Sequence, residues 1–95
     1  MFEVAPKETA IKANWDEANL YCTFCNHNGY TDWRLPTIEE LDYIYNSKND
    51  FVGSYYWSST EYRGNYAWLQ YFSSSGQHFK HKGYSYYVRA VRSLS

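Results

Sequence analysis

The chain lacks long apolar stretches. None of its hydrophobic runs approaches the ~20 residues that a membrane-spanning helix requires. A basic segment followed by an apolar one, the pattern of a secretion signal, is also missing. We therefore expect no membrane insertion and no signal peptide in this chain. A role at the surface of a virion or a cell would require export by other means.

Cysteine is scarce. The two cysteines, Cys22 and Cys25, are too few for the disulfide framework of many small secreted domains. They lie near the expected end of a helix, whereas redox CxxC pairs lie at a helix start, where the dipole lowers the thiol pKa. A zinc site that adds His78 and His81 is disfavoured, because residues three apart on a strand point to opposite sides. We expect two buried thiols, and neither a metal nor another cofactor.

A surplus of one charge is absent as well. The nine Lys and Arg residues and the ten Asp and Glu residues leave a net charge of −1. Such a chain has no overall field that attracts a polyanion, so nucleic acid is not an expected partner. The sequence also lacks a nucleophile elbow, a phosphate-binding glycine loop and an HExxH motif. Because helix capping and solvation explain Glu39, Glu40 and Asp42, we expect no enzymatic activity.

Aromatic residues, by contrast, are abundant. The 95 residues fit a single domain, 1–95, and include 4 Trp, 12 Tyr and 5 Phe. We expect all four tryptophans to be mostly buried: Trp15, Trp33, Trp57 and Trp68. Twelve tyrosines exceed what a small core can use, because each buried hydroxyl needs a hydrogen-bond partner. Many of them should face water or a partner molecule.

Two helices are predicted. Asn14 is a good N-cap for the first, which we expect to end between Asn26 and Gly29. The second begins after Pro36 at Thr37, which forms a capping box with Glu40. The expected inward-facing residues are Trp15, Ala18, Cys22 and Cys25 in the first helix and Ile38, Leu41, Ile44 and Tyr45 in the second.

Strands are predicted on both sides of these helices. Phe2 and Val4 indicate an opening strand, followed by a polar connection. The later strands are expected at 56–59, 67–72, 77–80 and 86–91, with a hairpin turn at 73–76. Two helices packed on a small antiparallel β-meander give an α+β fold.

Three blocks of sequence carry a family resemblance: GYTDWRLPTIEELDYIY at 29–45, YWSSTEY at 56–62 and YYVRAVR at 86–92. In this order they resemble the small bacterial and phage domains of the DUF1566, or Lcl C-terminal, type. That family belongs to the C-type-lectin-like superfamily, so the resemblance implies a C-type-lectin-like scaffold for binding. Many relatives have a cysteine near the C-terminus that is expected to bridge to the helix. This chain has Ala90 there, so the resemblance implies that Cys22 lacks its partner.

The resemblance has two further implications. The tripeptides with which C-type lectins bind calcium and sugar are absent, so any binding should be calcium-independent. Some proteins of this fold are the variable targets of diversity-generating retroelements, which produce surfaces rich in Tyr, Asn and Ser. The composition of the C-terminal half is compatible with such diversification.

Residues 55–87 are the candidate binding region. They are dominated by Tyr, Ser, Gly, Asn and His, the residues that antibody paratopes use as rigid anchors and adaptable hydrogen-bonding groups. The alternative is that strands simply prefer tyrosine. The clustering of tyrosines with loop residues favours binding. The candidate ligand-binding residues are Tyr55, Tyr62, Arg63, Asn65, Tyr66, Tyr71, His78, Lys80, His81, Lys82, Tyr84 and Tyr86.

The same half contains a basic group: Lys80, His81, Lys82, Arg63, Arg89 and Arg92. Such a cluster could bind a sulfated glycan or another acidic surface polymer. An ordinary solvated hairpin end is the favoured interpretation, because acidic residues are plentiful elsewhere on the chain. Arg34 has a separate, structural role in this interpretation, donating to backbone carbonyls beneath the following helix.

We therefore expect a non-enzymatic module that recognises a cell-surface protein or glycan as part of a phage particle or an adhesin. The alternative is a structural module, such as a virion decoration protein, that uses the same tyrosines for contacts within a homo-oligomer or a larger particle.

Overall fold

The computed structural model describes residues 1–47, 51, 54–74 and 76–94. Within these residues the chain forms two α-helices, one short 3₁₀ helix and eight strands, which confirms the α+β class. The helices are η1 (Lys7–Thr9), α1 (Trp15–Thr23) and α2 (Ile38–Ser47). The strands are β1 (Phe2–Val4), β2 (Ile11–Ala13), β3 (Trp33–Arg34), β4 (Tyr55–Glu61), β5 (Tyr66–Tyr71), β6 (Gln77–His81), β7 (Tyr86–Val88) and β8 (Val91–Ser93).

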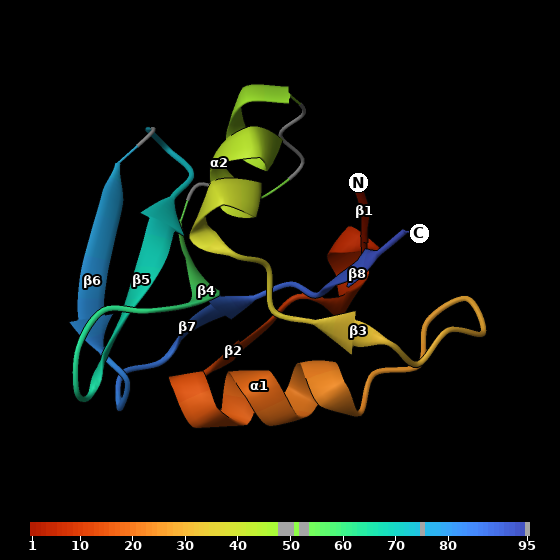
Figure 1. Ribbon diagram of the computed structural model, residues 1–95, viewed down its shortest axis with the longest axis horizontal. Helices are drawn as coiled ribbons and strands as arrows, with labels where there is room; N and C mark the ends of the chain where they lie inside the picture. Colours follow the sequence, from red (N-terminus) through yellow and green to blue (C-terminus); the bar gives the residue numbers. More distant parts are fainter. Residues whose placement is uncertain (48–50, 52–53, 75, 95) are drawn as a thin grey trace.

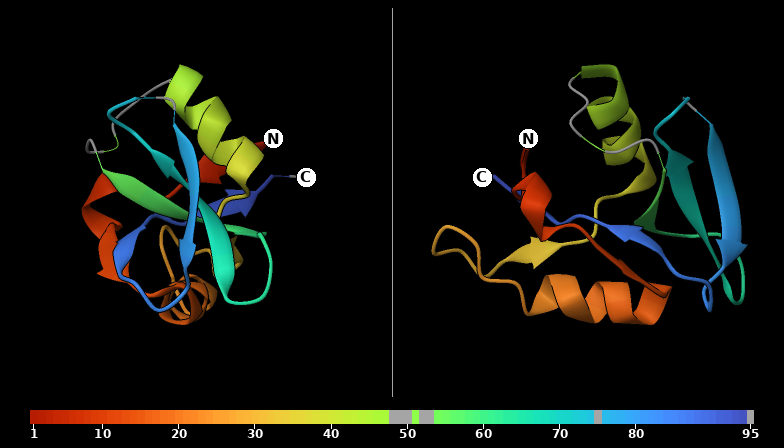
Figure 2. Two further views of the ribbon diagram at one scale, coloured as in Figure 1. Left: turned by 90° about the vertical axis from the view of Figure 1, so that its left-hand side faces the viewer. Right: turned by 180° about the vertical axis from the view of Figure 1, so that it is seen from behind.

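The strands form two sheets. One has the order β1-β8-β3 and the other the order β2-β7-β4-β5-β6, counted over the described residues. Neighbouring strands run antiparallel except for β4 and β7, which are parallel. The helices α1 and α2 lie on opposite sides of the strands, and the two chain ends lie next to each other beside β1 and β8 (Figures 1 and 2).

The start of α1 agrees with the sequence, but its end does not. The Asn14 side chain accepts a hydrogen bond from the Glu17 N–H at 2.9 Å, and the Glu17 carboxylate accepts one from the Asn14 N–H at 3.4 Å. This capping box confirms Asn14 as the N-cap. The helix stops at Thr23, earlier than expected, because the Cys25 N–H donates to the Cys22 carbonyl at 3.2 Å and tightens the chain into a turn. Cys25 is therefore buried but lies outside the helix.

The start of α2 is confirmed in detail. The Thr37 hydroxyl accepts from the Glu40 N–H at 3.1 Å, while the Glu40 carboxylate accepts from the Thr37 N–H at 2.9 Å. Arg34 adds a bidentate ion pair with the same carboxylate, both N–O distances being 2.8 Å. It also donates to the Leu35 carbonyl at 3.2 Å, as expected of a structural arginine. Of the predicted inward residues on α2, Ile38, Leu41 and Ile44 are buried, and Tyr45 is half-buried.

The closing segment differs from the prediction of one strand at 86–91. The structure divides it into β7 in the five-stranded sheet and β8 in the three-stranded sheet. Ala5 fixes the crossing, because its N–H donates to the Ala90 carbonyl at 2.9 Å and its carbonyl accepts from Arg89 Nε at 2.8 Å. The antiparallel meander is thus confirmed for β4, β5 and β6 only. The strand β2, which pairs with β7, was expected to be a polar connection.

Two groups of buried side chains form the core. The first lies between α1 and the five-stranded sheet and includes Trp33 and Trp57; the second lies beneath α2. All four tryptophans are mostly buried, as expected: Trp33 and Trp57 are fully enclosed, while Trp15 and Trp68 are partly buried and pack against the edges of the two groups. Trp15 lies at the rim, with the Lys82 ammonium 4.2 Å from its ring centroid. Trp68 packs against the edge of the second group.

Candidate functional site

The predicted binding residues lie on two different faces of the five-stranded sheet. Side chains alternate along a strand. In the β5–β6 register, Tyr66 lies opposite His81, and both face the side of the sheet that α2 occupies, the α2 face. Leu69 lies opposite His78, and both face the side that packs on α1, the α1 face. One sheet therefore cannot bring all twelve predicted residues to a common surface.

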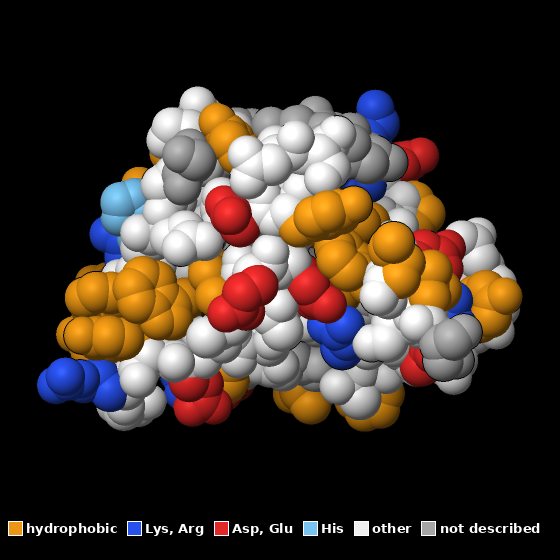
Figure 3. Space-filling model, turned by 45° about the horizontal axis from the view of Figure 1, so that its top comes forward, with side chains coloured by type: hydrophobic (Ala, Val, Ile, Leu, Met, Phe, Trp, Pro, Cys, Tyr) orange, Lys and Arg blue, Asp and Glu red, His pale blue; other side chains and the backbone are white. Residues whose placement is uncertain are grey.

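The α2 face carries a connected group of rings, three of them exposed and Trp68 partly buried, which we call the aromatic plate: Tyr62, Tyr66, Trp68 and Phe79. Phe79 is its centre, stacked on Tyr62 with ring centroids 4.1 Å apart. Phe79 also makes edge contacts with Trp68 at 5.3 Å and with Tyr66 at 6.1 Å. Tyr62, Tyr66 and Phe79 are 40%, 42% and 44% exposed. Figure 3 shows hydrophobic side chains gathered at the end of the molecule formed by β5 and β6.

The turn between β4 and β5 positions two of these rings. The Tyr62 N–H donates to the Tyr66 carbonyl and the Tyr66 N–H donates to the Arg63 carbonyl, both at 3.0 Å. Gly64 has a φ of 53°, which glycine adopts at little cost. The Asn65 carbonyl accepts from the backbone N–H of Lys82 at 2.7 Å. The turn is thus tied to the segment after β6, and the plate has a defined backbone support.

Polar and cationic groups line the edge of the plate. The Arg63 guanidinium lies over the Tyr62 ring, 5.3 Å from its centroid. His81 contacts Tyr66 edge-on at 5.7 Å and Tyr84 at 6.2 Å, and Tyr84 is exposed. The combination of aromatic rings with a peripheral arginine is typical of protein interaction surfaces.

A second aromatic group lies on the α1 face. The Tyr55 ring contacts Tyr71 at 4.7 Å, His78 at 5.7 Å and Tyr86 at 5.6 Å. Tyr86 also packs edge-on against the buried Trp57 at 5.3 Å. We expected Tyr86 to be as accessible as Tyr62, Tyr66 and Tyr84, but this contact leaves it half-buried. Lys80 lies on the same face, opposite Ala67.

The predicted basic group is largely dispersed. Arg89 is buried and bonded to the Ala5 carbonyl, so it is not part of a basic surface. Arg92 pairs with Asp32 at 2.8 Å and with Glu3 at 3.0 Å on the other sheet. Lys82 lies 3.5 Å from the Glu61 carboxylate and donates to the Gly64 carbonyl at 3.3 Å. The sequence showed the charges but not these partners, because the partners come from distant segments.

Sequence reasoning missed two residues of the plate. Trp68 was expected in the core, and Phe79 was not among the candidates, which were tyrosines and polar or charged residues. The predicted turn at 73–76 would place residue 68 opposite residue 81, whereas the structure places Trp68 opposite Phe79, so the pair could not be read from the sequence. Two large rings at facing positions on a strand pair indicate a shared surface.

The two thiols are buried and form no disulfide, as expected. Burial raises the pKa of Cys22 to about 12 and also raises the pKa of Cys25. Tyr21, next to them, has its pKa raised to about 12, chiefly by burial and then by Cys25. These groups stay protonated at neutral pH, so the thiols are poor nucleophiles. Across the part of the chain that the structure describes, no group of three or more His, Cys, Asp and Glu residues could hold a metal ion.

The comparison with protein families gives a match over almost the whole chain. The model of the Lcl C-terminal domain family matches residues 3–92. The chain belongs to the Lcl C-terminal domain family. No curated protein matches it. No helix among the described residues is long and apolar enough to cross a membrane.

The Lcl C-terminal domain match begins and ends at strand partners. Glu3 lies opposite Arg92 in the β1–β8 register, and their side chains form the 3.0 Å ion pair described above. The two ends of the matched segment in this chain are therefore paired with each other. Cys22 and Ala90 are both buried in the core group beneath α1.

Proposed function

We propose that this Lcl C-terminal domain is a non-enzymatic binding module that recognises a cell-surface protein or glycan through the aromatic plate. The supporting observation is that the fold leaves three rings of a connected group exposed, Tyr62, Tyr66 and Phe79, with the partly buried Trp68 packed beside them. Exposed apolar surface is unfavourable in water, and contiguous patches of it mark interaction sites on soluble proteins.

The rigidity of the plate supports this proposal. Its rings come from β5, β6 and the turn between β4 and β5, which backbone hydrogen bonds hold in register. The Ser58 hydroxyl also donates to the Trp68 carbonyl at 2.6 Å. A partner that stacks on these rings would order few side chains, so less conformational entropy opposes binding.

The groups with perturbed pKa values support a non-catalytic role. In enzymes such groups gather at the active site. Here each has a structural cause away from the plate: burial for Cys22 and Cys25, and a hydrogen-bonded arginine for Asp32 and Glu40, whose pKa values are lowered. None of these residues belongs to the plate.

We further propose that the domain works at the surface of a virion or a cell, and that its fold is a variant of the C-type-lectin-like arrangement. The support for the second point is the pairing of both chain ends in one sheet, with the helices on opposite sides of the strands. A determined structure of a family member in complex with its ligand would test both points.

The test of binding is a screen of the domain against glycan arrays and intact cells, followed by the double variant Tyr62→Ala with Tyr84→Ala. We expect the double variant to weaken binding at least about tenfold, since aromatic anchors carry most interface energy. Tyr43→Ala, an equally exposed tyrosine on α2 and outside the plate, is the matched control and should bind normally.

Two outcomes would contradict the proposal. Unchanged binding of the double variant, and of Phe79→Ala at the centre of the plate, would exclude the plate as the recognition surface. Loss of assembly into an oligomer or particle, with binding retained, would favour the structural alternative. Equilibrium sedimentation of the same variant distinguishes these outcomes.

A further inference from the structure

The strand β6 is a free edge of the five-stranded sheet. Among the described strands it has one neighbour, β5, and it lies at the end of the strand order (Figures 1 and 2). Its five residues, Gln77–His81, pair with β5 without a bulge. The other edge strands, β1, β2 and β3, have three, three and two residues. Because short edge strands resist the addition of a further strand, β6 is the edge best suited to receive one.

The two ends of the β5–β6 hairpin fix which backbone groups bond across it. The Tyr71 N–H donates to the Gly76 carbonyl at 2.9 Å, and the Lys82 N–H donates to the Asn65 carbonyl at 2.7 Å. Both pairs belong to the same register, in which even-numbered residues of β6 are paired with odd-numbered residues of β5. Hydrogen-bonded pairs alternate with non-bonded pairs along an antiparallel ladder. The even-numbered residues of β6 therefore bond to β5.

The odd-numbered residues of β6 turn their backbone groups towards the free edge. These residues are Gln77, Phe79 and His81. In the part of the chain that the structure describes, one of these groups has a backbone partner, since the His81 carbonyl accepts from the Tyr84 N–H at 3.2 Å. Three N–H groups and two carbonyls thus remain on the edge. An extended polypeptide is the ligand whose own N–H and C=O groups match this row.

We propose that β6 binds an extended segment of the partner protein as an added strand. The proposal rests on the proposed function of the aromatic plate and makes its partner a protein rather than a glycan. Phe79 connects the two, because its ring is the centre of the plate and its backbone groups lie on the free edge. A side chain of the added strand that lies opposite Phe79 would contact its ring and extend the plate.

The charges on β6 select the kind of segment. The strand contains His78, Lys80 and His81 and no acidic residue. His78 and Lys80 lie on the α1 face, where every second side chain of the added strand would meet them. A carboxylate at such a position would be attracted to Lys80, whereas a second copy of β6 would bring like charges together. The expected segment is therefore apolar on its plate side and acidic on the other side.

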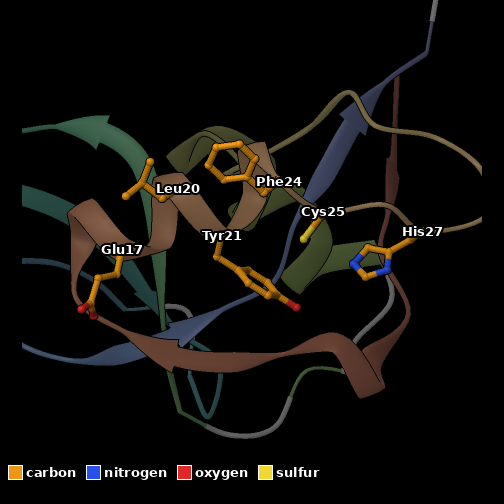
Figure 4. Close-up of a pocket in the computed structure, with 6 residues that line it drawn as sticks. All are labelled: Glu17, Leu20, Tyr21, Phe24, Cys25 and His27. Carbon is orange, nitrogen blue, oxygen red and sulfur yellow. The ribbon is translucent and has the colours of Figure 1, made fainter.

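The apolar surface beside α1 differs from this edge. Leu20 and Phe24 are exposed there (Figure 4). The Tyr21 hydroxyl, on the same surface, already donates to the Thr9 carbonyl at 2.6 Å. Because the backbone groups of α1 bond within the helix, an extended segment laid on this surface would leave its own N–H and C=O groups without protein partners. The edge of β6 is the better site for a polypeptide.

Linear peptides selected from a displayed random library on the immobilised 95-residue domain provide the probe. Gln77→Pro should weaken their binding at least about tenfold, because it removes an outward N–H and places a ring on the edge. Edge strands accept proline where the N–H faces solvent, so the fold should persist. Gln77→Ala, which loses the same side chain but keeps the N–H, should bind at least about tenfold more tightly than Gln77→Pro. Equal binding by the two variants would overturn the proposal.

Amide hydrogen exchange tests the geometry on the wild-type domain. When a selected peptide saturates the domain, the amides of Gln77, Phe79 and His81 should exchange at least about tenfold more slowly than in the free domain. The amides of His78 and Lys80 should change little, because they already bond to β5. Slowed exchange confined to residues outside β6 would overturn the proposal.

Charge reversal tests the acidic side of the segment. Lys80→Glu should weaken the binding of an acidic selected peptide about threefold or more, and a fresh selection on this variant should favour Lys and Arg. Lys12→Glu on β2, the edge strand at the other end of the sheet, is the matched control and should bind as the wild type does. Unchanged binding by Lys80→Glu would overturn the choice of an acidic segment.

Failure of this proposal is distinguishable from failure of the proposed function. Normal peptide binding by Gln77→Pro with lost binding by Phe79→Ala would overturn the added strand and leave the plate as the site. Lost binding by Gln77→Pro with normal binding by Phe79→Ala would count against the plate alone. A dimer of the free domain that Gln77→Pro dissociates in equilibrium sedimentation would show that a second copy occupies the edge, and would also overturn the proposal.

Discussion

Both faces of the five-stranded sheet carry aromatic residues, but the two faces differ in how far these residues are buried. On the α1 face, Trp57, Ala67 and Leu69 are completely buried. On the α2 face, the same strand pair leaves Tyr66 and Phe79 more than two-fifths exposed. The difference lies in what covers each face. The α2 helix packs over the end of β5 where Tyr45 contacts Phe72 and Gln70 donates to Asp42, and of the plate only Trp68 packs against the core group beneath this helix.

This comparison shows that residue type alone does not decide burial in this domain. Trp57 and Trp68 lie on neighbouring strands, but only Trp57 is enclosed, where its indole N–H donates to the Ala13 carbonyl at 3.0 Å. The position of each helix relative to the sheet decides which aromatic residues stabilise the fold and which remain available to a partner.

The largest expected effect is on the buried side. Trp57→Ala should lower the free energy of unfolding by about 3–5 kcal/mol, because it removes a large buried ring and leaves a cavity. Trp68→Ala should cost about 1–2 kcal/mol, since that ring is only partly buried. Denaturant unfolding of both variants measures the difference. Equal losses of unfolding free energy in the two variants would show that the α1 face and the α2 face contribute alike to stability, which would contradict the comparison.

A disulfide between positions 22 and 90 would test the packing of the buried α1 face directly. Because Ala90 and Cys22 belong to the same buried group, Ala90→Cys should form a disulfide with Cys22 under oxidising conditions. The link should add up to about 4 kcal/mol for a loop of this length. Mass spectrometry and thermal unfolding with and without reductant check this, and Ala90→Ser is the control for the change in polarity. A folded protein without the crosslink would contradict the assignment of these positions.

A smaller effect is expected from the Arg34–Glu40 pair under α2. The hydrogen-bonded Arg34 side chain lowers the pKa of Glu40, assisted by the Thr37 N–H. The folded state thus favours the ionised carboxylate, so the stabilisation is full above the ordinary glutamate pKa and is lost as pH falls through the lowered folded value. Glu40→Gln keeps a capping-box acceptor. It should cost about 1 kcal/mol or less at neutral pH, because water screens a partly exposed pair.

Unfolding curves of wild type and Glu40→Gln over a pH series measure this contribution. The difference between the two proteins should shrink as pH falls below the ordinary glutamate pKa. A difference that stays constant with pH would indicate that the charge of Glu40 does not stabilise the fold.

Local signals made the helices predictable. Asn14 and Thr37 begin their helices as the sequence indicates, because capping depends on residues within one turn. The strand boundaries after 86 were not predictable, since the division into β7 and β8 depends on Ala5, far away in the sequence. Local pattern cannot show a contact between the two ends of the chain.

The candidate site was predicted only in part, because residue type can be read from the sequence but the position of a strand residue relative to the helices cannot. Composition located the exposed tyrosines Tyr62, Tyr66 and Tyr84. It could not separate them from Tyr55 and Tyr86, because the face that a strand residue occupies depends on register and on where the helices lie. It also missed Phe79, whose role follows from its pairing with Trp68.

The most direct test of the account measures both properties on one protein, Phe79→Ala. Because Phe79 is the central ring of an uncovered plate, the account predicts a loss of about 1 kcal/mol or less in the free energy of unfolding, together with at least about a tenfold loss in binding to the partner found in the screen. A large loss of stability with binding retained per folded molecule would contradict it, and would place Phe79 with the core rather than with the recognition surface.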